Sequence, residues 1–144
     1  MNNVQQRLSS RFSALAALAA MALAGATTAR AEMVVIVNAN HPAAALSADQ
    51  VANVYLGKDS SFTPLDLPES APLRGEFYKK IAGKDAAQLK AMWARLIFTG
   101  KAQPPKQVGS SAEAVKHVAG NDRAIAYVDK SAVDASVKTV LRID

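Results

Sequence analysis

The sequence contains no cysteine, so it can form neither a disulfide nor a zinc site built on thiolates. It has only two histidines, His41 and His117, which lack the His-Glu-x-x-His spacing of zinc hydrolases. The Gly-x-Ser-x-Gly, P-loop and Gly-x-Gly-x-x-Gly motifs are also missing. These absences exclude the common signatures of hydrolases, NTPases and dinucleotide enzymes. We therefore expect a protein that is not an enzyme and that carries no metal or other cofactor.

Long hydrophobic runs are limited to Ser13–Ala26, which is uncharged, follows two arginines and is too short to span a bilayer comfortably. Ala29-Arg30-Ala31 matches an A-x-A cleavage site. We expect residues 1–31 to be a secretory signal peptide and residues 32–144 to form one exported, periplasmic domain. Cleavage after Ala26 and an uncleaved membrane anchor remain alternatives, whereas a lipoprotein anchor would require cysteine.

The expected mature chain also lacks a large excess of one charge. The whole sequence has a net charge of +5, but three of its arginines and none of its acids precede residue 32, which leaves +2. The basic isoelectric point therefore gives no support for a nucleic-acid partner. We expect no nucleic acid to bind and no membrane to be spanned once the signal is removed.

Strand and helix patterns are mixed along residues 32–144. The β-branched run Met33–Asn38 predicts a strand buried on both faces, and Leu89 and Trp93 begin the most amphipathic helical stripe. Other strands are expected at Thr63–Leu67, Ala124–Val128 and Val137–Ile143, and helices at 47–57, 71–82, 84–98 and 110–120. Pro64 predicts a short or edge strand, and Pro104-Pro105 predicts a loop over Lys101–Gly109. The fold class is α/β, with a single small sheet flanked by helices.

The stretch Leu67–Lys80 predicts a loop that opens into a helix. Ser70 is a suitable N-cap, and Pro72 is tolerated in a first turn. A helix N-terminus next to a serine hydroxyl and Arg74 has the chemistry of an anion site. The alternative is that Ser70 only caps the helix and that Arg74 is a solvated surface charge.

A second helix begins at Ser110-Ser111, where Glu113 completes the pattern of a capping box. Capping alone explains these serines, and a shared anion site would require this N-terminus to approach Arg74. Asp66 and Glu69 are close in sequence, but two acids three residues apart in a loop are usually solvated, and we expect no catalytic role for them.

Four segments resemble the phosphate-binding proteins of phosphate ABC transporters, a group of type II periplasmic binding proteins. These segments are Leu46–Lys58, with its Val-Tyr-Leu-Gly-Lys ending, Val34–Asn38, Phe98–Pro105, and Ala124–Asp129, which is similar to an Ala-Ile-Gly-Tyr-Val strand of that family. The resemblance covers nearly all of residues 32–144. It implies a fold like one lobe of these two-lobed proteins.

The resemblance also implies a ligand, namely a small oxyanion such as phosphate, and a transport or sensing role with an ABC transporter or another envelope protein as partner. The segment that corresponds to the family's anion loop is Glu69–Arg74. The implied ligand-binding residues are Ser70, Ala71 and Arg74, with Ser110 and Ser111 as second candidates. Because Glu69–Arg74 lacks the family's Gly-Thr pair and contains Pro72, the alternative is a ligand-free module that binds another envelope protein.

Overall fold

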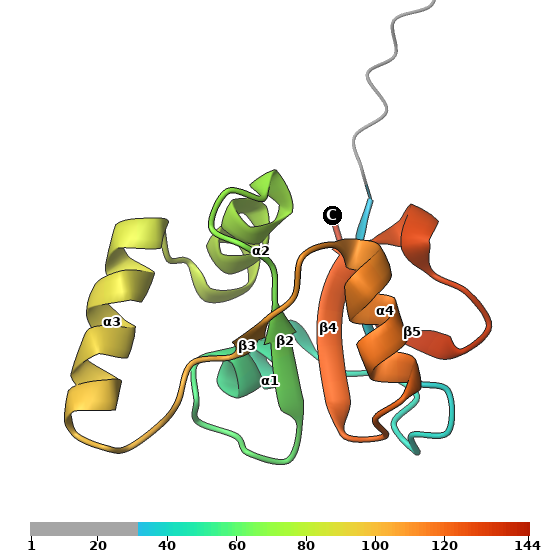
Figure 1. The fold of residues 1–144 in the computed structure, drawn as a ribbon, viewed down its shortest axis with the longest axis horizontal. Coiled ribbons are helices and arrows are strands. Elements are labelled where there is room, and N and C mark those ends of the chain that lie inside the picture. Colours follow the sequence, from blue (N-terminus) through green and yellow to red (C-terminus); the bar gives the residue numbers. More distant parts are fainter. Residues whose placement is uncertain (1–31) are drawn as a thin grey trace, which may run out of the picture. The chain divides into compact units, whose positions relative to one another are not determined.

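The computed structural model describes residues 32–144, which form one five-stranded sheet flanked by helices, as the sequence predicts (Figure 1). The expected signal peptide, residues 1–31, lies outside the described residues. The strands are β1 (Met33–Asn38), β2 (Thr63–Asp66), β3 (Lys106–Gln107), β4 (Ala124–Asp129) and β5 (Val137–Ile143). The helices are α1 (Ala48–Tyr55), α2 (Pro72–Ala82), α3 (Ala86–Phe98) and α4 (Ser111–Ala119), and a 3₁₀ turn covers Lys130–Ala132.

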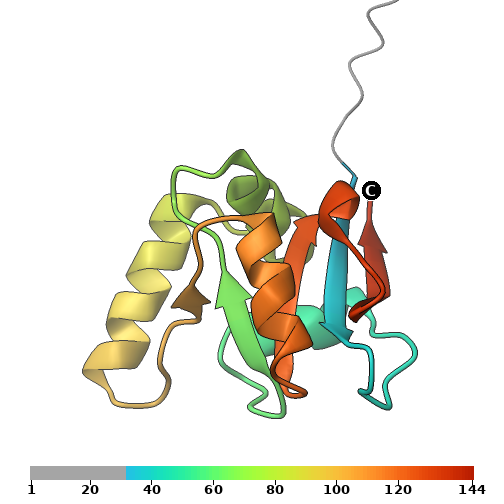
Figure 2. The same cartoon turned by 45° about the vertical axis from the view of Figure 1, so that its right-hand side comes forward.

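The sheet has the strand order β3-β2-β4-β1-β5. Strands β3, β2 and β4 are parallel, whereas β1 is antiparallel to both β4 and β5. The carboxyl ends of the three parallel strands therefore meet at one edge of the sheet. Helix α4 covers one face, α1 lies behind the other, and α2 lies near the carboxyl end of β2 (Figures 1 and 2).

The core is centred on β1 and β4. Every residue of Met33–Asn38 is buried, as are Ala124–Val128, which confirms two strands covered on both faces. The single polar side chain of β1, Asn38, donates hydrogen bonds to the carbonyls of Val118 (2.9 Å) and Ala119 (3.0 Å). This side chain thereby satisfies two carbonyls at the end of α4 and ties that helix to the sheet.

Of two local expectations about strands, the short strand at Pro64 is confirmed and the loop over Lys101–Gly109 needs correction. Strand β2 is short but lies inside the sheet, between β3 and β4. Its Pro64 is tolerated because β3 pairs only with Leu65 and Asp66, so no neighbour on that side needs the missing N–H. The region Lys101–Gly109, expected as a loop throughout, contains β3, because Lys106 and Gln107 follow Pro104-Pro105 and can extend alongside β2.

Helix α3 is fastened to the domain by few side chains. Leu89 and Trp93, which begin the predicted amphipathic stripe, are its only buried residues and anchor the helix. Gly57 lies close to Trp93 and has φ +76°, and a Cβ there would lie 3.3 Å from the Trp93 ring. The predicted stripe continues through Leu96 to Ile97, but Ile97 is 54% exposed; Phe98, which lies outside that stripe, is 93% exposed.

Candidate functional site

Asp66 ends β2 at the carboxyl edge of the parallel strands and is only 3% exposed. Its Oδ2 accepts a hydrogen bond from the Tyr78 hydroxyl at 2.8 Å, and its Oδ1 accepts one from the Tyr127 hydroxyl. Oδ1 also accepts the backbone N–H of Leu67 at 2.9 Å. The carboxylate, expected to be solvated, is instead buried and joins β2, β4 and α2. The expectation failed because tyrosines distant in sequence supply its partners.

The tyrosines belong to a buried aromatic cluster under the edge. The ring of Phe77 stacks on that of Tyr127 with centroids 3.9 Å apart, and Tyr55 packs edge-on against both. Burial, and next the charge of Asp66, raise the pKa of Tyr78 and of Tyr127 far above the ordinary value. Burial likewise raises the pKa of Tyr55. All three hydroxyls therefore stay protonated and act as hydrogen-bond donors.

Arg74 projects from the first turns of α2 onto this cluster. Its Nε lies 3.3 Å from Asp66 Oδ2, and its guanidinium carbon lies 5.2 Å from the centroid of the Tyr78 ring. The side chain is 12% exposed, so its position is set by burial as well as by charge. Within residues 32–144, no hydrogen bond or ion pair involves its two terminal nitrogens. These nitrogens form the fork with which arginine binds carboxylates and phosphates.

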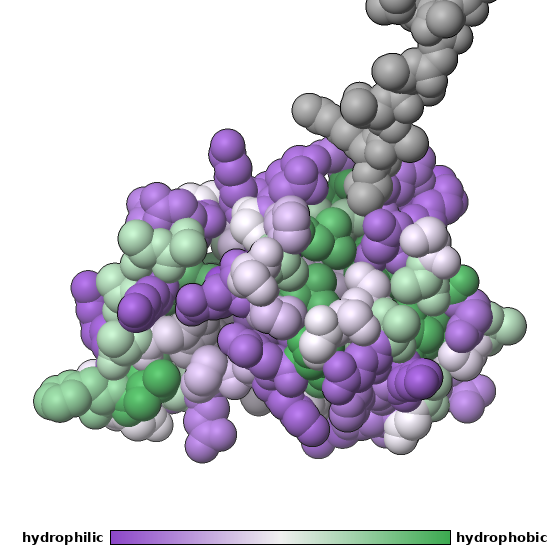
Figure 3. Space-filling view, turned by 45° about the horizontal axis from the view of Figure 1, so that its top comes forward, coloured by the Kyte–Doolittle hydropathy of each residue, from purple (hydrophilic) through white to green (hydrophobic). Residues whose placement is uncertain are grey.

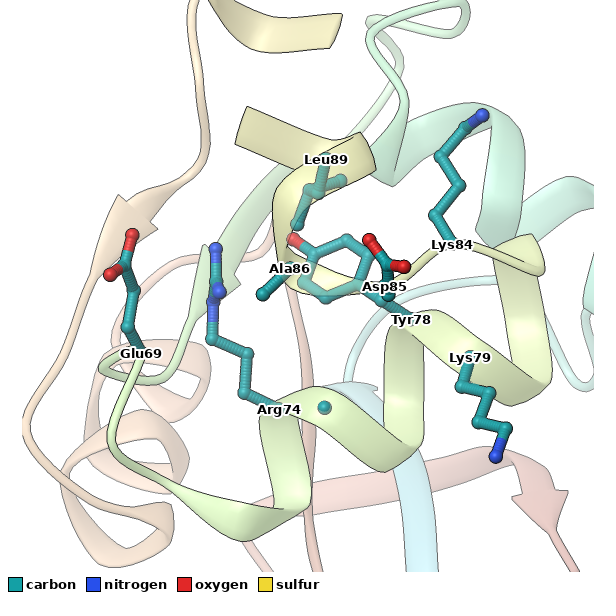
Figure 4. A pocket seen from close by; sticks show the side chains of 9 residues that line it. Glu69, Arg74, Tyr78, Lys79, Lys84, Asp85, Ala86 and Leu89 are labelled. Carbon is teal, nitrogen blue, oxygen red and sulfur yellow. The ribbon is translucent and has the colours of Figure 1, made fainter. Parts of the chain in front are cut away.

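Two adjoining pockets reach Arg74. One of about 170 Å³ lies between α2 and α3 and has Tyr78 and Leu89 in its wall. The other, of about 290 Å³, extends along α3 to Trp93 and to Gln107 at the end of β3. Figure 4 shows Arg74 extending between Glu69 and Ala86, whereas the amines of Lys79 and Lys84 point away from it. In the first pocket Arg74 is thus the cation directed inward, whereas Lys90 also lines the second.

Ser70 does not cap α2, contrary to the expectation from its sequence position. The N-cap is Ala71, which has no side-chain cap, and Ser70 is an exposed residue of the preceding turn. The backbone N–H of Ala71 donates to the carbonyl of Pro68 at 2.9 Å. Because Pro72 at the first position of α2 has no N–H, the polar groups available at this N-terminus are few.

At the N-terminus of α4, the serines are engaged within the protein. Ser110 is the N-cap and accepts the N–H of Glu113 at 3.2 Å. The expected capping box is incomplete, because the Glu113 carboxylate accepts the N–H of Gly109 at 2.7 Å and not that of Ser110. The Ser111 hydroxyl accepts the N–H of Asp129 at 3.1 Å. The end of α4 is therefore already occupied by a carboxylate.

The predicted site residues are not brought together around one cavity. Neither pocket at Arg74 is lined by Ser70, Ser110 or Ser111. The structure instead groups Arg74 with Asp66, which the sequence analysis expected to be solvated, and with Tyr78 and Tyr127, which sequence patterns did not single out. A buried carboxylate can be recognised from sequence only as an acid directly after an apolar strand segment, as Asp66 follows Leu65, and this signal is weak.

Within residues 32–144, three or more acidic or histidine side chains nowhere gather in a way that would hold a metal ion. The helices of this described part are also too short or too polar to cross a bilayer.

The fold is that of one lobe of a periplasmic binding protein. Several solved structures of phosphate-transport binding proteins superimpose on 76% of this chain, at sequence identities from 9% to 22%. At such identities the similarity establishes the fold. The chain spans less than half of the length of these proteins. No protein-family model and no curated protein matches the sequence.

Among these structures is a protein from Clostridium perfringens described as a phosphate ABC transporter substrate-binding protein with bound phosphate, with a TM-score of 0.61, 22% identity and 44% of its length covered. An ABC-type phosphate transport receptor from Vibrio cholerae has a TM-score of 0.59 and 18% identity, with 45% covered. PstS from Borrelia burgdorferi has a TM-score of 0.58 and 9% identity, with 46% covered. None of these names describes an enzyme.

Proposed function

We propose that this protein is an exported solute-binding protein that binds a small oxyanion such as phosphate, with Arg74 as the principal ligand. The observation that carries the proposal is the restrained guanidinium of Arg74. Asp66 holds it through Nε, and its terminal nitrogens are directed into a pocket. Ligands of open α/β sheets bind at the carboxyl ends of the strands, where this side chain lies. The fold shared with phosphate-binding proteins supports the same ligand class.

The remaining predicted ligands take secondary places in this proposal. Ser70 is exposed shortly before Arg74 in sequence but lines neither pocket, so it would contribute only if its turn moved toward the guanidinium. The backbone N–H of Ala71 would bind an anion only if its hydrogen bond to the Pro68 carbonyl broke. Ser110 and Ser111 would do so only if the capping hydrogen bonds at the N-terminus of α4 broke. Export rests on residues 1–31, and an ABC transporter as partner rests on the resemblance and on the shared fold. We propose no catalytic activity.

A second function is favoured by a separate observation. Both places that suit an anion already hold a carboxylate of the protein, Asp66 at Arg74 and Glu113 at the N-terminus of α4. An anion would therefore meet electrostatic repulsion as well as attraction. This arrangement supports the alternative that the domain binds no ligand and serves as an interaction module in the envelope.

Calorimetric titration with phosphate and with sulfate separates the two proposals. For a dissociation constant near 1 mM, 10 mM anion should stabilise the fold by about 1.4 kcal/mol and raise its melting temperature by several degrees. The variant Arg74→Lys keeps the charge but loses the fork, so its binding should weaken about tenfold. The matched control, Arg95→Lys on the exposed surface of α3, should bind as the unchanged protein does.

The absence of both binding heat and a thermal shift at 10 mM of either anion would eliminate the oxyanion proposal. The interaction module would then remain. Equal binding by the Arg74→Lys variant and the unchanged protein would show that an anion binds elsewhere.

A further inference from the structure

The end of α3 forms a basic, apolar tip whose most exposed residue, Phe98, lines neither pocket at Arg74, although Ile97 also lines the second of them. Phe98 is 93% exposed and Ile97 is 54% exposed, and they are the only large hydrophobic side chains so exposed in residues 32–144. Figure 3 shows apolar side chains gathered at the left-hand tip of the molecule, where α3 lies in Figure 1. We call Ile97, Phe98 and the basic residues nearest to them in sequence, Arg95 and Lys101, the α3 tip.

The charge of the α3 tip has one sign. Residues 86–106 contain no acidic residue, and their four basic residues are all exposed and form no salt bridge within the described chain: Lys90, Arg95, Lys101 and Lys106. A helix that combines exposed aromatic and aliphatic side chains with cations alone is typical of segments that lie on anionic lipid surfaces.

The helix end holds Phe98 outward. The Thr99 hydroxyl donates to the carbonyls of Arg95 (3.1 Å) and Leu96 (3.2 Å), and Gly100 adopts φ +66° to close the helix. Phe98 is thus part of a closed helical turn. It cannot fold back onto the core without breaking that turn, so its exposure is a fixed property of the fold.

We propose that the α3 tip docks on an anionic lipid surface, with Phe98 and Ile97 inserted at the headgroup level. A stable protein interface needs about 800 Å² from each partner, and an aromatic side chain supplies about 150–250 Å². Two protruding residues therefore fall short of what a protein partner requires. A fluid lipid surface needs no matching cavity, and each nearby lysine or arginine adds to its attraction.

The test is co-sedimentation of the full-length gene product, in whatever processed form the producing cells release, with lipid vesicles. One set of vesicles mixes phosphatidylglycerol with phosphatidylcholine, and the other contains phosphatidylcholine alone. Binding should require the anionic lipid and fall with added salt. Phe98→Ser should weaken it about tenfold without changing the melting temperature, because Phe98 is exposed. All variants carry the same N-terminus, so any contribution of residues 13–26 is equal among them.

The charge arm compares two exposed lysines. Lys101→Gln at the α3 tip should weaken vesicle binding about fivefold, whereas Lys116→Gln on α4 should leave it unchanged. Equal binding by Phe98→Ser, equal binding to neutral vesicles, or equal losses in the two lysine variants would overturn the proposal. Absent vesicle binding together with Phe98-dependent capture of an acidic protein would assign the tip to a protein partner instead.

Discussion

Asp66 is the residue on which the carboxyl edge of the sheet depends. It accepts hydrogen bonds from Tyr78 on α2, Tyr127 on β4 and its own neighbour Leu67, and it is paired with Arg74. No side-chain polar atom buried in residues 32–144 lacks a hydrogen-bond partner, so this network is fully satisfied. A fully satisfied buried carboxylate orients everything bonded to it, and here it orients the proposed ligand-binding arginine.

Replacing Asp66 by asparagine should destabilise the fold by about 3 kcal/mol. The amide has one acceptor oxygen where the carboxylate has two, and Arg74, which is mostly buried, would lose its counter-charge. Urea denaturation measures the change. The matched control, Asp122→Asn in an exposed turn, should shift stability by less than about 0.5 kcal/mol. Equal effects of the two variants would contradict a structural role for the Asp66 network.

The three tyrosines of the chain predict its behaviour in alkali. All three are buried, and burial raises the pKa of each in the folded state above the unfolded value near 10. The unfolded chain therefore loses these protons first, so this stability is complete below pH 10 and is lost as the pH rises beyond it. Absorbance at 295 nm should rise only as Trp93 fluorescence reports unfolding. A tyrosine that ionises near pH 10 in the folded protein would disprove the arrangement.

At the scale of elements, the two helix N-termini near this edge differ although both follow serines. Ser110 caps α4 through the N–H of Glu113, whereas Ser70 stands outside α2, whose N-cap is Ala71. Ser110→Ala should therefore cost about 1 kcal/mol, and Ser70→Ala less than about 0.5 kcal/mol. Urea denaturation of the two variants decides the point. A larger loss for Ser70→Ala would restore Ser70 as the cap of α2.

Sequence patterns predicted the elements better than the details at their ends. The β-branched run of β1 depends only on neighbours in sequence and appears as expected, and the capping box formed by Ser47 and Gln50 is equally local. The position of Ser70 depends on the turn through which Ala71 bonds Pro68, and β3 depends on a partner strand 41 residues earlier, Leu65 beside Lys106. The pairing of β3 is long-range and leaves no local signal, whereas the turn at Ser70 is local but was not recognised from its residues.

The candidate site shows the same division. Arg74 was predicted as a ligand because it follows a loop that opens into a helix, and its neighbourhood could be recognised from that pattern. Its actual partners are Asp66 and Tyr78, and Tyr127 in turn bonds Asp66; these residues come from three elements that meet only after the sheet has formed. The sequence alone therefore indicated the cation but not the carboxylate that positions it and offsets its charge.

At the scale of the whole molecule, the parallel arrangement of β3, β2 and β4 brings this network to one edge of the sheet. The fold places Arg74 between two pockets there, and the α3 tip adjoins the second of them through Ile97 while Phe98 projects away from both. Because Phe98 lines neither pocket, loss of vesicle binding in Phe98→Ser should leave anion binding unchanged. The two proposals can therefore fail independently.

The most direct test of the proposed oxyanion site is an NMR titration of the labelled protein with phosphate, followed through backbone amides and arginine side chains. We expect saturable shifts at the Arg74 side chain and in residues 66–75, and little change in residues 109–113, where Glu113 already fills the end of α4. Shifts confined to residues 109–113, or none at 10 mM phosphate, would contradict Arg74 as the ligand-binding residue.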